Sequence, residues 1–103
     1  MRTYQKVNVR YWQPDVGHSS HSYFLKKPLG LEQSCPLLDR VLYRRGSTPI
    51  GIEEIPGILN KIEGARKKIK GSGRPRLMGY LERAERIFEN AKGIFPIQVT
   101  PIR

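Results

Sequence analysis

The sequence predicts an α+β domain in which a small antiparallel or mixed sheet packs on a C-terminal helical hairpin. Three features indicate this class: alternating residues near the N-terminus, two helical apolar stripes between residues 52 and 91, and a short proline-bounded segment at the C-terminus. With 103 residues the chain can bury one modest core, so residues 1 to 103 are expected to form a single small basic domain. The expected order is β-β-(α)-α-α-β.

The first element is a strand over residues 3 to 12, "TYQKVNVRYW", because its side chains alternate with period two. One face would carry Val7, Val9 and Tyr11, and the other Lys6, Asn8, Arg10 and Trp12. Turn residues follow from Pro14 to Gly17, and residues 22 to 27 are expected to return as a second strand. The two strands form a hairpin with a wide loop.

The next segment, "CPLLDRVLYRR", is compatible with two structures. Its apolar residues share one helical face, and Pro36 suits a helix start. A short strand through residues 40 to 44 is the alternative.

Two amphipathic helices follow. The first is expected from about 53 to 70, with Glu53 at its start, a cationic end, and Pro56 in its first turn, where a missing N–H costs nothing. The second is expected from about 75 to 92, with Gly93 as its stop. Only residues 71 to 74 connect them, so an antiparallel hairpin is expected, and residues 95 to 102 then form an edge strand bounded by prolines.

The charge of the chain predicts its kind of partner. Nineteen Lys and Arg against nine Asp and Glu leave a net charge of +10, with a pI of about 10.2. A field of this size attracts polyanions, so non-catalytic binding of DNA or RNA is the preferred expectation. The alternative is a small interaction module, an accessory subunit or inhibitor, that docks on an acidic protein and adds a strand at residues 95 to 102.

The densest positive charge lies in "KKIKGSGRPR", residues 67 to 76. The triplet from Gly73 to Pro75 resembles the core of an AT-hook, a DNA minor-groove segment, although Ser72 stands where the hook has its first arginine. Helix punctuation is the other explanation, because glycines suit a tight turn and proline suits a first helical position. In either case five cations remain as candidate phosphate contacts: Lys67, Lys68, Lys70, Arg74 and Arg76.

A second candidate surface is the polar face of the first strand, with Lys6, Arg10 and Trp12 as contact residues beside Tyr4. Interleaved aromatic and basic side chains on an exposed sheet bind single strands by stacking and phosphate attraction. If the helical hairpin covered this face instead, Trp12 and Tyr4 would belong to the core.

Other chemistry has little support in the sequence. His18 and His21 are close enough in sequence to bind one metal ion, as in a metal-dependent nuclease. No second ligand pair accompanies them, so no metal and no cofactor are expected. Cys35 is expected to be a small packed residue. No apolar run is long enough to cross a bilayer, and a lone cysteine without an export signal suggests the cytoplasm.

Overall fold

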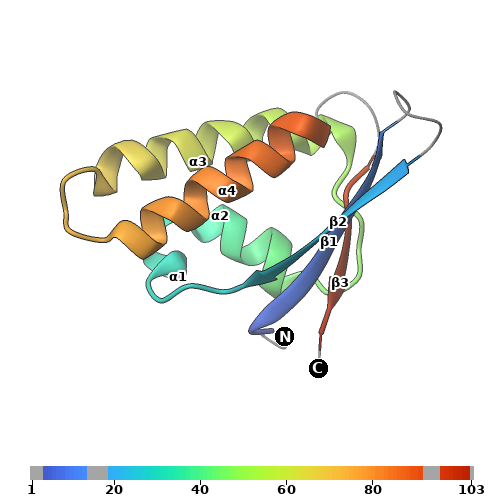
Figure 1. Ribbon diagram of the computed structural model, residues 1–103, viewed down its shortest axis with the longest axis horizontal. Helices are drawn as coiled ribbons and strands as arrows, with labels where there is room; N and C mark the ends of the chain where they lie inside the picture. Colours follow the sequence, from blue (N-terminus) through green and yellow to red (C-terminus); the bar gives the residue numbers. More distant parts are fainter. Residues whose placement is uncertain (1–3, 14–18, 92–95, 103) are drawn as a thin grey trace.

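The computed structural model describes residues 4–13, 19–91 and 96–102. The elements appear in the expected order and confirm the α+β class (Figure 1). Their bounds are β1 Lys6–Gln13, β2 Ser19–Lys26, α1 Leu31–Ser34, α2 Pro36–Asp39, a π-helical turn Arg40–Arg44, a 3₁₀ turn Ile52–Glu54, α3 Ile55–Ile69, α4 Pro75–Ala91 and β3 Gln98–Pro101. The expected turn after the first strand and the expected stop at Gly93 lie outside the described residues.

The sheet has three antiparallel strands in the order β2-β1-β3. β1 is the central strand, since Val9 lies opposite both Tyr23 of β2 and Val99 of β3. Its inner face carries side chains that are almost fully buried, as the period-two pattern predicts. Figure 1 shows the sheet at one end of the molecule and the two long helices extending away from it.

α3 and α4 form the expected antiparallel hairpin. Gly71 and Gly73 in the connecting turn have φ angles of 80° and 77°, a region that favours glycine. Pro75 is the first residue of α4, and Pro56 lies in the first turn of α3. The turn glycines and both prolines are therefore explained by helix punctuation.

Residues 36 to 44 are helical, so the alternative strand through residues 40 to 44 is wrong. The helix is favoured because it directs Leu38, Val41 and Leu42 into the core together. Its last turn also binds the residue two positions before β1, since the N–H of Tyr4 donates to the carbonyl oxygen of Tyr43 at 2.8 Å. Cys35, just before this helix, is buried as expected.

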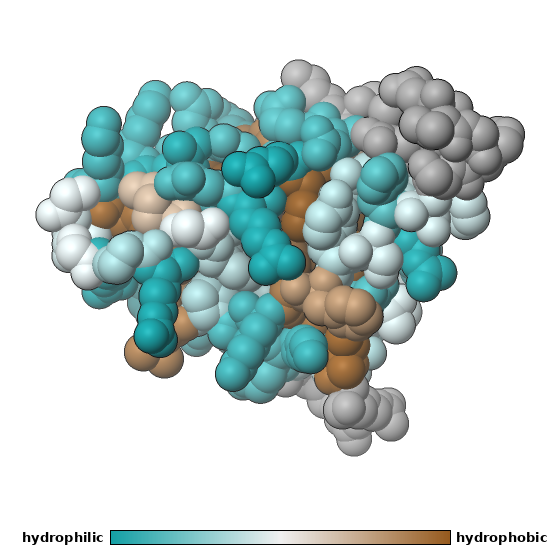
Figure 2. Space-filling model, in the orientation of Figure 1, coloured by the Kyte–Doolittle hydropathy of each residue, from teal (hydrophilic) through white to brown (hydrophobic). Residues whose placement is uncertain are grey.

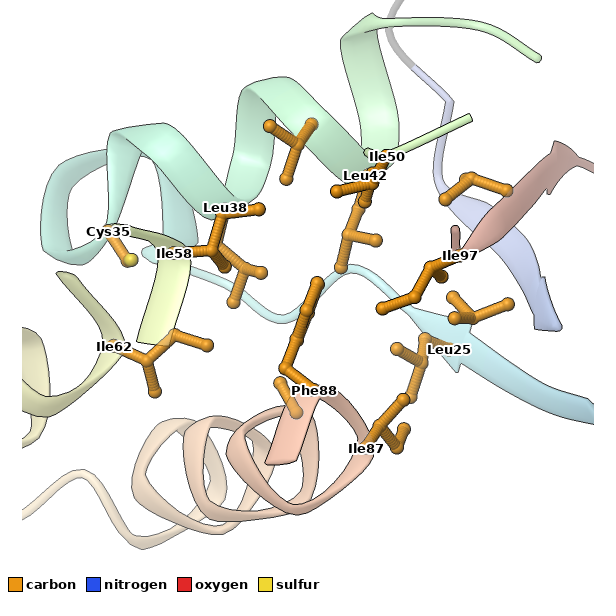
Figure 3. Packing of buried hydrophobic residues seen from close by; sticks show 14 of the residues in the cluster. Leu25, Cys35, Leu38, Leu42, Ile50, Ile58, Ile62, Ile87, Phe88 and Ile97 are labelled. Atoms are coloured by element: carbon orange, nitrogen blue, oxygen red, sulfur yellow. The ribbon is translucent and has the colours of Figure 1, made fainter. Parts of the chain in front are cut away.

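One apolar core joins the helices to the sheet. Figure 3 shows the Phe88 ring of α4 between side chains from the helix of residues 36 to 44, α3, and the strands. The labelled neighbours Leu42, Ile58 and Ile97 are at most 2% exposed. Phe88 itself is 1% exposed, so it fills the centre of the interface between the hairpin and the sheet.

A buried carboxylate stabilises the layer beside this core. Asp39 is 3% exposed and lies between Lys27 Nζ, at 2.9 Å, and Arg44 Nε, at 2.8 Å. The Lys27 side chain is also almost buried and contacts Glu32 at 3.2 Å. Two cations thus offset the cost of burying Asp39, and neither is free for a ligand.

The buried hydroxyl pair of Tyr43 and Tyr80 predicts a pH effect on stability. The two hydroxyls hydrogen-bond each other, and burial raises the pKa of Tyr43 to about 12. In the unfolded chain this tyrosine ionises near pH 10, so its contribution is complete below pH 10 and is lost as the pH rises through about 12. We expect the free energy of unfolding of the wild type to fall in this range.

The comparison variant is Tyr43→Phe, which cannot ionise at this position. It should be about 1 kcal/mol less stable than the wild type at neutral pH, because the hydrogen bond is lost. The gap should narrow above pH 10, and the comparison cancels the titration of the lysines. Urea denaturation at each pH measures this, and a constant gap would contradict the prediction.

Candidate nucleic-acid interface

The face of the sheet that points away from the helices forms one continuous exposed surface, here called the outer sheet face. Its strands place alternate side chains on this side, and all of them are exposed or half-buried. The members are Lys6, Asn8, Arg10, Trp12, Ser20, Ser22, Phe24, Lys26, Gln98 and Thr100. These ten side chains include three cations and no carboxylate.

Two aromatic rings lie on the outer sheet face. Trp12 is 49% exposed and Phe24 is 58% exposed. The alternative in which the helical hairpin covers Trp12 is therefore wrong, because the hairpin packs against the opposite face. Exposed rings beside cations are the groups that hold unpaired bases.

Tyr4 does not belong to this surface, although it lies two residues before Lys6 and would share its face if the strand extended that far. It precedes β1, and its backbone N–H bonds to Tyr43 instead of to a neighbouring strand. The alternation of β1 therefore does not extend to Tyr4, which is partly buried and packs against the core.

Two cations of the outer sheet face occupy facing positions on neighbouring strands. Lys6 lies directly opposite Lys26 in the register. The hydrogen bond from the N–H of Lys27 to the carbonyl of Gln5 makes Lys6 and Lys26 a pair without mutual hydrogen bonds, the closer kind. Like charges at such a position are destabilising, so their proximity favours an anionic ligand as the explanation. Lys6 Nζ also lies 5.7 Å from the centre of the Phe24 ring.

The pairing of Lys6 with Lys26 predicts that Lys26→Thr stabilises the protein. Removing one of the two facing charges, with a residue of high strand propensity, should raise the free energy of unfolding by about 0.2–1 kcal/mol at low salt. The gain should shrink at high salt, because salt screens the repulsion that the substitution relieves. Lys26→Arg keeps the charge and should give no such gain. Chemical denaturation at two salt concentrations measures both, and a destabilised Lys26→Thr would contradict this interpretation.

The second candidate surface, here called the turn cluster, consists of Lys67, Lys68, Lys70, Arg74 and Arg76. All five side chains are exposed. Lys67 contacts Glu63 at 3.4 Å, and no other residue of the turn cluster makes an ion pair within the described part of the chain. Arg74 and Arg76 line a hollow of about 730 Å³ whose other wall includes Leu29, which is 97% exposed.

The structure separates the two candidate surfaces. Figure 1 shows the turn between α3 and α4 at the end of the molecule far from the sheet, along an axis that measures 42 Å. Hydrophilic side chains dominate the face of α3 and α4 visible in Figure 2. Lys6, Arg10 and Trp12 thus lie together, and the turn cluster does not extend their surface.

Phe24 and Lys26 extend the outer sheet face, but the sequence interpretation did not include them. Both β2 faces contain apolar residues, so alternation alone does not tell whether Phe24 or Leu25 points inward. The pairing of Asn8 with Phe24 fixes the answer. The signal present in the sequence was the spacing of Ser22, Phe24 and Lys26, which matches a polar strand face with one ring.

The remaining candidates gain no support from the described residues. His18 lies outside them, and His21 stacks on Tyr11 with ring centres 5.4 Å apart. Within residues 4–13, 19–91 and 96–102 no three potential metal ligands lie together. None of the helices in these ranges has the length and apolarity needed to cross a membrane.

The proline-bounded C-terminal strand offers little edge for strand addition. Ile102 donates to the carbonyl of Lys6, so alternation directs the backbone groups of Ile97, Val99 and Pro101 outward. Ile97 already exchanges both hydrogen bonds with Ile50, and Pro101 has no N–H. Val99 alone keeps an outward donor.

Comparison of the chain with protein-family models, with curated proteins and with solved structures found no significant match. The arrangement of the side chains therefore carries the functional argument.

Proposed function

We propose that this protein binds single-stranded nucleic acid, DNA or RNA, on its outer sheet face without catalysing a reaction. The observation that carries the proposal is the combination of two exposed rings, Trp12 and Phe24, with three cations and no carboxylate. Bases stack on the rings while Lys6, Arg10 and Lys26 neutralise the phosphates.

The spacing of the two rings suits a strand laid across the sheet. Trp12 lies opposite Ser20 of β2. Ser20 and Phe24 are four residues apart, so their positions along β2 are separated by about 13 Å at the rise of a strand. Arg10 lies between them, opposite Ser22, where it can contact the backbone that joins two stacked bases. Stacking and phosphate contacts hold any sequence, so little base preference is expected.

The turn cluster has a smaller part in this proposal. It consists of five cations and offers no ring for stacking, so it attracts phosphates without holding bases. Its distance from the sheet makes it a separate contact with a longer strand, or with duplex.

The test is a salt titration of binding to a labelled oligothymidylate and to a duplex of equal length. The account predicts tighter binding of the single strand, and affinity that falls with salt by a log–log slope of about 0.7 for each phosphate contact. Charge reversal at Lys6, Arg10 and Lys26 should reduce the slope for the single strand.

The matched control reverses three charges of the turn cluster, Lys67, Lys68 and Lys70. This control should weaken all nucleic acids about equally and keep the preference for single strands. Absence of binding at low salt would refute the proposal. If the preference for single strands disappeared only when the turn cluster was reversed, the single strand would bind at the turn cluster and not at the outer sheet face.

A further inference from the structure

The outer edge of β2 is open along the part of the strand that the structure describes. The register and the bond from Lys27 to Gln5 direct the backbone groups of Ser22, Phe24 and Lys26 away from β1. No described residue makes a backbone hydrogen bond to these groups from outside the sheet. An eight-residue strand thus presents a row of donors and acceptors, whereas the edge of β3 is mostly closed.

A groove runs beside this edge, between β2 and α4. It has a volume of about 300 Å³ and is lined by Tyr23, Gly79, Glu82, Arg83, Arg86, Ile87 and Asn90. The space beside Gly79 is open, since a Cβ added there would meet no atom within 4 Å. A strand added to β2 would direct every second side chain into this groove.

The groove has cations that the protein does not use. Arg83 and Arg86 are both exposed, and neither makes an ion pair with a described residue. Glu82, one helical turn before Arg86, is not within ion-pair distance of it. Guanidinium groups three residues apart on one helix face suit the carboxylate of an inward-facing Asp or Glu.

We propose that the β2 edge and the α4 groove bind an extended acidic peptide of a partner protein by strand addition. The peptide backbone pairs with Ser22, Phe24 and Lys26, and its acidic side chains contact Arg83 and Arg86. The charge of +10 favours this occupant over a second copy of the chain, which would bring Lys26 and the same positive field to the edge.

The probe is a labelled, end-blocked peptide of alternating valine and glutamate, compared with the same peptide N-methylated at alternate residues. Methylation keeps the charge but removes the donors and space that strand pairing needs. We expect the unmodified peptide to bind at least about tenfold more tightly, and to shift the backbone amide signals of Ser22, Phe24 and Lys26.

The variant pair is Arg83→Ala with Arg86→Ala, matched by Lys68→Ala with Lys70→Ala in the turn cluster. Both pairs remove two charges from exposed helix or turn positions. Only the first pair lines the groove, so only its removal should weaken peptide binding, by about tenfold or more. Equal losses in both pairs, or equal binding of the methylated peptide, would overturn the proposal, because either result indicates attraction by net charge alone. A dimer that forms without peptide and excludes it would make a second copy the occupant and would also overturn it.

Discussion

Replacing both rings of the outer sheet face, Trp12→Ala with Phe24→Ala, is expected to weaken single-stranded nucleic-acid binding by about 30-fold or more. Each stacked base contributes about 1–3 kcal/mol through an aromatic ring, and the two rings are far enough apart to hold different bases. The cations remain in the variant, so residual binding should keep most of its salt dependence. Anisotropy titrations with a labelled oligothymidylate measure the loss.

The controls separate stacking from structural damage. Trp12→Phe keeps a ring and should lose much less affinity than Trp12→Ala. Both substituted side chains are about half exposed, so the double variant should unfold at nearly the wild-type denaturant concentration. Full affinity in a folded double variant would show that the rings do not contact the ligand.

Truncating the central core ring, Phe88→Ala, is expected to have the largest effect on stability, a loss of about 3–5 kcal/mol. Phe88 is 1% exposed and lies between the hairpin and the rest of the core, so its removal leaves a cavity that several elements cannot all close (Figure 3). A domain of this size has only about 5–15 kcal/mol of stability in total, so this one ring carries a large share.

Guanidinium denaturation measures this loss, with Trp12→Ala as the matched control. Both substitutions truncate an aromatic ring, but Trp12 is half exposed, and its removal should cost less than about 1 kcal/mol. Similar losses for the two variants would contradict the assignment of Phe88 to the core and of Trp12 to the surface. A partly folded Phe88→Ala protein at neutral pH would agree with the prediction.

The periodic elements could be predicted from the sequence because their patterns are local. Apolar residues at three- and four-residue steps identified α3 and α4, and two prolines with two turn glycines marked where these helices begin and meet. The alternation of β1 also separated Val9 from Arg10 correctly. Each of these features depends on neighbours within a few residues, so the sequence alone determines it.

The sequence interpretation missed features that depend on pairing between distant segments, because local patterns indicate such pairing only weakly. Lys26 joins the outer sheet face because the hairpin register sets it opposite Lys6, and Phe24 joins it because Leu25 is the one that enters the core. The groove beside Arg83 exists because α4 packs next to β2. The expectation of Tyr4 on the polar face failed for the same reason, since its contact with Tyr43 spans most of the N-terminal half.

The fluorescence of Trp12 tests the central claim most directly, because Trp12 is the single tryptophan of the chain. A base that stacks on the indole should quench its emission, so titration with unlabelled oligothymidylate at low salt should give saturable quenching. The midpoint of the quenching titration should match the affinity measured by anisotropy. Added salt should reverse the quenching. Binding that saturates in the anisotropy experiment while the emission of Trp12 stays unchanged would contradict the account, because the nucleic acid would then lie elsewhere on the protein.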